Sequence, residues 1–191
     1  MSHEDRVYRR YGLHVVRISA YKRDGFTLLI SGQDEPDQFL SSQGRIPLAG
    51  DRRALVRMLR RLSADTSLGP RVEGLLRDAS SLQSRRWMSF RRIEHALARQ
   101  PAAWRWEERA LTLGRLEFLW DLCETLAMDE HKERLKRGYP LGEIAELSYA
   151  RFETNASYVR QLSALDLRQA LIDAMEIMQV SEKHLTCYRG H

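Results

Sequence analysis

The stretch Asp-Arg-Arg-Ala-Leu-Val-Arg-Met-Leu-Arg-Arg-Leu, residues 51–62, decides how the middle of the chain is built. Its apolar side chains recur at the three- and four-residue spacing of a helix, at Ala54, Leu55, Met58, Leu59 and Leu62. Asp51 stands before this stripe as an N-cap, because its carboxylate can accept a hydrogen bond from a first-turn backbone N–H. The opposite face is basic. The sequence therefore predicts an amphipathic helix that buries one face and presents arginines on the other.

Further helices are expected on both sides of this one. Gly69-Pro70 ends it, and Pro70 is suited to the first turn of the next helix. Ser84 is expected to cap a third helix, with Trp87, Phe90, Ile93 and Leu97 as its stripe. A long helix is predicted over 102–127, followed by a charged extension over 128–137. Residues 141–165 fit either one long helix or two, and Asp166 is expected to cap a last helix after them.

Near the N-terminus the pattern changes from helical spacing to alternation. Residues 11–31 predict a β-hairpin whose two strands are joined by the turn Lys22-Arg23-Asp24-Gly25. Two strands are marginal in water, so the hairpin must pack on helices or pair with another chain. Its open edge gives the protein a route to a homodimer.

The expected fold is therefore mainly α, with an N-terminal β-hairpin followed by a bundle of about 6–7 helices. We expect three parts, namely 1–44 as the hairpin and loop, 45–180 as the helical domain and 181–191 as a flexible tail. A chain of 191 residues can bury a core without a disulfide or a metal. No apolar run is long enough to span a bilayer, so no membrane partner is expected. The polar N-terminus and two distant cysteines favour a cytoplasmic protein.

No catalytic motif stands out, and we expect neither an enzyme nor a cofactor. A phosphate-binding glycine loop and a nucleophile elbow are both absent from the sequence. His184, Cys187 and His191 lie close together near the C-terminus, but they lack the fourth ligand and the paired cysteines of a zinc site. We therefore predict surface residues there and no metal.

Charge is distributed unevenly along the chain. Residues 45–99 hold thirteen arginines against five acids, whereas residues 100–191 hold twelve basic residues against fifteen acids. The chain has 27 arginines and 4 lysines, and guanidinium groups grip phosphates through two parallel hydrogen bonds. The residues predicted to bind nucleic acid are Arg53, Arg57, Arg60, Arg61, Arg85, Arg86, Trp87, Arg91 and Arg92.

The aromatic residues and the arginines of the basic block, residues 45–99, each have two interpretations. Trp87 and Phe90 would stack on unpaired bases if they were exposed, but their spacing with Ile93 also fits a buried helical stripe. The arginines would contact phosphates, or they would pair with the acidic C-terminal half of the same chain. A coding bias toward arginine also explains their number but not their clustering.

Residues 138–165 partly match the pattern of a helix-turn-helix. Residues 144–147 would form its first helix, and residues 155–162 its recognition helix with Asn155 as cap. The link between them is too long for the tight form and lacks the usual turn glycine. The same apolar spacing fits one uninterrupted helix, and the local charge is negative.

The sequence thus favours a non-enzymatic helical protein that binds nucleic acid, DNA rather than RNA, as a regulator or accessory factor. The alternative is a protein-interaction adaptor or assembly factor whose basic face docks an acidic protein partner.

Overall fold

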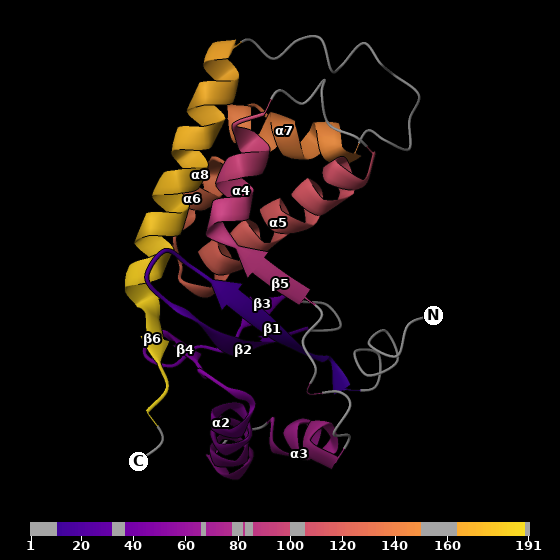
Figure 1. Ribbon diagram of the computed structural model, residues 1–191, viewed down its shortest axis with the longest axis vertical. Helices are drawn as coiled ribbons and strands as arrows, with labels where there is room; N and C mark the ends of the chain where they lie inside the picture. The colour runs from indigo at the N-terminus through magenta and orange to yellow at the C-terminus, as the bar shows by residue number, and fades with distance from the viewer. Residues whose placement is uncertain are drawn as a thin grey trace. The chain divides into compact units, whose positions relative to one another are not determined.

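In the computed structural model, the described residues are 11–31, 37–65, 68–77, 82, 86–99, 106–149 and 164–189. Within them the chain forms seven helices, α2 to α8, and six strands, β1 to β6 (Figure 1). Contacts divide the chain into two compact units. Unit 1 is residues 1–88 together with 182–191, and unit 2 is residues 89–181.

Unit 1 is built on a four-stranded sheet in the order β3-β2-β1-β5. Its strands are β1 (Leu13–Ser19), β2 (Asp24–Ile30), β3 (Gln38–Phe39) and β5 (Arg86–Ser89). β2 pairs antiparallel with both β1 and β3, whereas the arrows of β1 and β5 run the same way in Figure 1, so the sheet is mixed. The expected hairpin is therefore confirmed, but as the centre of a larger sheet.

The turn of the hairpin differs from the predicted Asp24-Gly25 turn. The chain reverses over residues 20–23, where the Ala20 N–H donates to the Arg23 carbonyl at 2.8 Å, and Gly25 already lies in β2 opposite Ile18. Gly25 is needed for space rather than for a positive φ. A Cβ there would lie 2.8 Å from the Ala49 carbonyl oxygen, because the chain after β4 runs against this end of β2.

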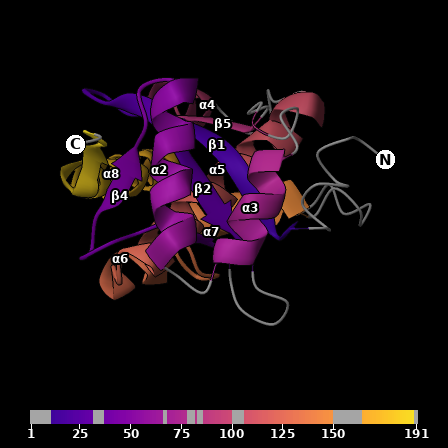
Figure 2. The same ribbon diagram turned by 90° about the horizontal axis from the view of Figure 1, so that it is seen from below.

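Two helices cover one face of the sheet in unit 1. They are α2 (Arg52–Asp65) and α3 (Gly69–Arg77), which lie side by side over β1 and β2 (Figure 2). The Asp51 Oδ1 accepts a hydrogen bond from the Ala54 N–H at 2.7 Å, so the predicted N-cap is confirmed. The core between helices and sheet includes Leu13, Val15, Leu28, Leu55, Met58, Leu59, Val72 and Leu75. The predicted stripe of α2 thus packs on the hairpin.

A second, two-stranded sheet joins distant parts of the sequence. β4 (Ile46–Leu48) pairs parallel with β6 (Leu185–Cys187), and the Tyr188 N–H extends the pairing to the Leu48 carbonyl. Residues 181–191 were expected to be a flexible tail. In the structure α8 continues to His184 and β6 follows it, with Leu185 fully buried.

The segment predicted as a third helix from Ser84 also differs. Residues 86–89 form β5, and the helix α4 (Phe90–Leu97) begins only after Ser89. The alternation of an exposed Trp87 with a buried Met88 is that of a strand at the edge of a sheet. Pairing with β1, about seventy residues earlier in the chain, decides this conformation over local helical spacing.

Unit 2 is helical. It contains α4, α5 (Trp106–Thr125), α6 (Asp129–Glu133), α7 (Pro140–Tyr149) and most of α8 (Ala164–His184). α5 agrees with the predicted long helix, and α8 begins two residues before the predicted cap Asp166. α7 ends at Tyr149, whereas the expected recognition helix over 155–162 lies outside the described residues.

The fold class is therefore α/β, not a hairpin followed by a helical bundle. The seven helices of the described residues agree with the predicted 6–7, but β3, β4, β5 and β6 were missed. Each has two to four residues, too short for alternation to show, and all but β3 pair with partners far away in sequence. No helix in the described part of the chain is long and apolar enough to cross a membrane.

Candidate nucleic-acid interface

The exposed face of α2 carries the predicted arginine strip of unit 1. Arg53, Arg57, Arg60 and Arg61 are all exposed, while the opposite side of the helix is buried in the core. At 1.5 Å per residue, the strip from Arg53 to Arg61 is about 12 Å long. Arg53, Arg57 and Arg61 form no ion pair with any residue that the structure describes. Arg53, Arg57 and Arg61 are therefore exposed cations without a counter-charge among the described residues.

Trp87 is also exposed in unit 1, with 44% of its surface accessible. Arg17 on the neighbouring strand β1 places its Cζ 5.9 Å from the centroid of the Trp87 ring and 5.9 Å from that of the Phe26 ring. The three side chains thus span β2, β1 and β5 as a stack of ring, guanidinium and ring. Such a stack holds the exposed indole in place by cation–π attraction.

Asp24 fixes Arg17 within this stack. The Arg17 Nε donates to Asp24 Oδ1 at 2.9 Å, and Nη2 donates to Oδ2 at 3.1 Å. These hydrogen bonds, together with the negative charge of Asp24, raise the pKa of Arg17. Because its charge is already matched by a carboxylate, Arg17 orients Trp87 rather than offering a free cation for phosphate.

Not every arginine of the basic block faces solvent. Arg71 on α3 is half-buried and donates to the backbone carbonyls of Tyr11, Gly12 and Ser31. Arg77 pairs with Glu73 on the same helix at 3.4 Å. Arg71 is therefore committed to the backbone of unit 1, whereas Arg77 remains on the surface with its charge partly matched by Glu73.

The predicted site residues are divided between the two units. Arg91 and Arg92 are exposed on α4, which belongs to unit 2, whereas the α2 strip and Trp87 belong to unit 1. Arg86 has its backbone in β5, but its side chain lies outside the described part, as does the whole of Arg85. Phe90 is fully buried, so the interpretation as a core residue is confirmed for Phe90 and is wrong for Trp87.

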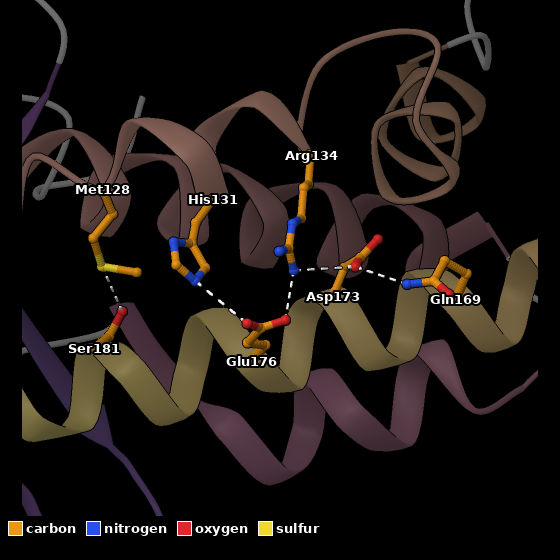
Figure 3. A network of polar contacts seen from close by, with 7 residues as sticks. All are labelled: Met128, His131, Arg134, Gln169, Asp173, Glu176 and Ser181. Carbon is orange, nitrogen blue, oxygen red and sulfur yellow. Dashed lines mark hydrogen bonds and ion pairs between the residues drawn. The ribbon is translucent and has the colours of Figure 1, made fainter.

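Part of the acidic C-terminal half is neutralised by its own basic residues (Figure 3). Arg134, just after α6, reaches two carboxylates on α8, with its Nη1 2.6 Å from Glu176 Oε2 and 3.3 Å from Asp173 Oδ1. Asp173 is only 5% exposed and also accepts from the Gln169 side chain at 3.0 Å. His131 Nε2 lies 3.8 Å from Glu176, too far for a hydrogen bond. These acids are thus satisfied within unit 2.

Two of the three residues considered for zinc have other surroundings. His184 Nδ1 lies 3.0 Å from the Gly44 carbonyl, and Cys187 is exposed in β6. His191 lies outside the described residues. Among the described residues, no three His, Cys, Asp or Glu side chains are placed to hold a metal ion.

Sequence reasoning missed two arginines that the structure brings to notice. Arg17 was treated only as part of a strand, and its position opposite Phe26 becomes visible once the hairpin register is known. Arg115 lies on α5, outside the basic block, yet its side chain reaches α4. No local sequence pattern indicates either residue, because the contacts of each are made with a neighbouring strand or helix.

Fold and surface together define a two-unit α/β protein with an exposed basic helix on its sheet-containing unit. Among solved structures, the chain is similar to the crystal structure of the SatS C-terminal domain in complex with bromine, with a TM-score of 0.66. The likeness covers 94% of this chain and 96% of that one, at 21% sequence identity, and it shows the fold alone. No protein-family model matches the chain, and no curated protein does.

Proposed function

We propose that this protein is a non-enzymatic nucleic-acid-binding factor that uses unit 1. The observation that carries the proposal is the exposed strip of α2, where Arg53, Arg57 and Arg61 have no acidic partner in the described residues. Cations left without internal partners attract the phosphate backbone and release its counterions. DNA is the expected polymer, bound mainly through its backbone.

Trp87 adds a preference to this electrostatic binding. Its exposed indole lies in the same unit as the α2 strip and is held by Arg17. Aromatic rings stack on unpaired bases, a contact worth about 1–3 kcal/mol per base, whereas paired bases inside a duplex are not available to it. We therefore propose that single strands or frayed ends bind more tightly than a fully paired duplex.

The test is fluorescence anisotropy with labelled single- and double-stranded DNA and RNA over a salt series. The variant is Arg53→Gln/Arg57→Gln/Arg61→Gln. The matched control, Arg137→Gln/Arg168→Gln/Arg189→Gln, removes the same charge from three exposed arginines elsewhere. We expect the first triple variant to bind at least tenfold more weakly and to lose about 2–3 units of salt slope. Equal binding by the two triple variants would show that net charge, not the α2 strip, is responsible.

The second candidate function is that of an adaptor whose basic helix docks an acidic protein. The observation that favours it is the same row of exposed arginines on α2, since Arg53, Arg57 and Arg61 without acidic partners in the described residues would also attract the carboxylates of an acidic polypeptide. Poly-L-glutamate serves as the probe of an acidic polypeptide. Binding of poly-L-glutamate that depends on the α2 strip, with no binding of DNA or RNA at low salt, would replace the first proposal by this one.

A further inference from the structure

His131 on α6 has a buried ring nitrogen that makes no hydrogen bond. Only 19% of the side chain is exposed, and Nε2 is buried without a partner among the residues that the structure describes. The group in front of it is a carboxylate on α8, since Glu176 Oε1 lies 3.8 Å from Nε2 (Figure 3). That distance is about 1 Å longer than a hydrogen bond from a charged donor to a carboxylate. The ring therefore lies beside an acceptor that it does not yet bind.

Glu176 can accept a second donor. Arg134 Nη1 donates to its Oε2 at 2.6 Å, whereas no described residue donates a hydrogen bond to Oε1. Arg134 and His131 are three residues apart, so both reach α8 from the same side of the chain. Hydrogen bonding by Arg134, the charge of Arg134 and then the charge of His131 lower the pKa of Glu176. The carboxylate therefore stays ionised throughout the pH range in which a histidine changes its charge.

The other ionic groups on the elements around His131 have partners of their own or face solvent. They are Asp173 on α8, bound by Arg134 and Gln169, Glu124 on α5, bound by Lys132, and Asp129 and Glu130, both exposed on α6. Arg134 carries the same charge as a protonated His131, but it binds Oε2 of Glu176 and leaves Oε1 to the ring. Glu176 is therefore the carboxylate that a charged His131 meets.

We propose that His131 is a pH-sensitive switch in unit 2, whose protonated ring donates from Nε2 to Glu176 Oε1 and joins α6 to α8. Histidine ordinarily takes up its proton near about pH 6.5. The folded protein offers the imidazolium a carboxylate that the unfolded chain lacks, so this pair adds stability as the pH falls through about 6.5 and loses it as the pH rises. The contribution is lost again in acid, once Glu176 is protonated below its ordinary pKa of 4.5.

The switch is tested by thermal unfolding of the full chain at about pH 5.5 and about pH 8, on either side of the usual titration of histidine. The parent should unfold at a higher temperature than His131→Gln, and this difference should be about 1–3 °C larger at the lower pH, the size expected for one partly exposed ion pair. His95→Gln is the matched control, because His95 is exposed on α4. Its difference from the parent should grow clearly less toward the lower pH.

Glu176→Gln keeps the test informative if His131→Gln folds poorly. Glu176 is ionised at both pH values, so the part of its effect that comes from Arg134 is the same at both, and any extra loss at the lower pH reports on His131. In the Glu176→Gln background, His131→Gln should have the same effect at both pH values. A loss in Glu176→Gln that does not grow toward the lower pH overturns the switch. So does a pH-dependent effect of His131→Gln that persists without Glu176, or one that His95→Gln reproduces.

Discussion

The guanidinium of Arg71 on α3 lies against the backbone of Gly12 at the start of β1, with Nη2 2.7 Å from the Gly12 carbonyl oxygen. The same side chain donates to the carbonyls of Tyr11 at 2.6 Å and Ser31 at 3.0 Å. One arginine thus joins α3 to both ends of the hairpin. Its fork makes this possible, since three carbonyls need donors pointing in different directions.

Arg71→Lys should lower the free energy of unfolding by about 2–4 kcal/mol, because a lysine cannot reach three carbonyls and leaves part-buried acceptors unpaired. Urea unfolding followed by circular dichroism measures the change. Arg77→Lys, on the exposed side of the same helix, is the control and should change stability by less than about 0.5 kcal/mol. Equal effects of the two substitutions would contradict the structural role of Arg71.

Gly12→Ala should disturb the same contact from the other side. Gly12 has a φ of +58°, and a Cβ there would lie 2.3 Å from Arg71 Nη2. The substitution should cost about 1–3 kcal/mol from backbone strain and the displaced guanidinium. In an Arg71→Lys background its cost should be smaller, because part of the contact is already lost. Strict additivity in the double variant would mean that the two residues do not interact.

The ion pair between Arg134 and Glu176 predicts a pH dependence. Hydrogen bonding by Arg134, and then its charge, lower the pKa of Glu176 below its ordinary value of 4.5. A lowered pKa in the folded state stabilises the protein above pH 4.5, and this contribution is lost as the pH falls through the folded-state pKa. The parent should therefore be more stable than Glu176→Gln at about pH 6, and the difference should shrink toward about pH 3. We expect less than about 1 kcal/mol, since Glu176 is exposed.

Arg134→Gln supplies the control for this pH dependence. Without the guanidinium, the effect of Glu176→Gln on stability should no longer vary with pH through this interaction. Arg134→Gln itself should destabilise by about 1–3 kcal/mol, because it removes the charged partner of Asp173, which is buried. Thermal melts at several pH values measure both effects. A pH dependence that persists unchanged in Arg134→Gln would assign it to another group.

The two cysteines should differ in reactivity. Burial raises the pKa of the Cys123 thiol to about 12, so almost no thiolate forms near neutral pH, whereas Cys187 is exposed in β6. In the folded protein at about pH 8, iodoacetamide should modify Cys187 and leave Cys123 intact, as read by peptide mass spectrometry. In urea both should react. Rapid labelling of native Cys187→Ser would show that Cys123 is not protected.

The C-terminal strand should contribute to the stability of unit 1. Leu185→Ala removes a fully buried side chain from β6 and should lower the free energy of unfolding by about 2–4 kcal/mol. Cys187→Ala, two residues later on the exposed side of the strand, should have little effect. Urea unfolding compares the two variants. Similar small effects from both would restore the expectation of a loose tail.

Local chemistry made part of this fold predictable. Asp51 caps α2 through a bond to Ala54, three residues away, and Pro70 lies in the first turn of α3. The hairpin forms between strands separated by four residues. Each of these features depends on residues that are neighbours in sequence, so helical spacing, capping and alternation were enough to find them.

The features that were not predicted depend on pairing between parts of the chain that lie far apart in sequence. Trp87 fits a helical stripe by spacing, yet β5 pairs with β1, and β6 pairs with β4 across about 140 residues. The candidate sites were likewise predictable only in part. The sequence identified the arginines of α2. It did not show that Arg71 donates to the backbone carbonyl of Gly12, or that Arg115 donates to the backbone carbonyl of Arg92.

The sequence by itself determined where helices begin, which of their faces are apolar and where positive charge accumulates, because these depend on spacing along the chain. Only the tertiary structure decided which arginines remain available to a ligand. That choice depends on which carbonyls, carboxylates and rings approach each guanidinium, and these groups come from elements far apart in sequence. The exposed strip of α2 and the backbone-bound Arg71 are therefore products of packing, although composition had already supplied their charge.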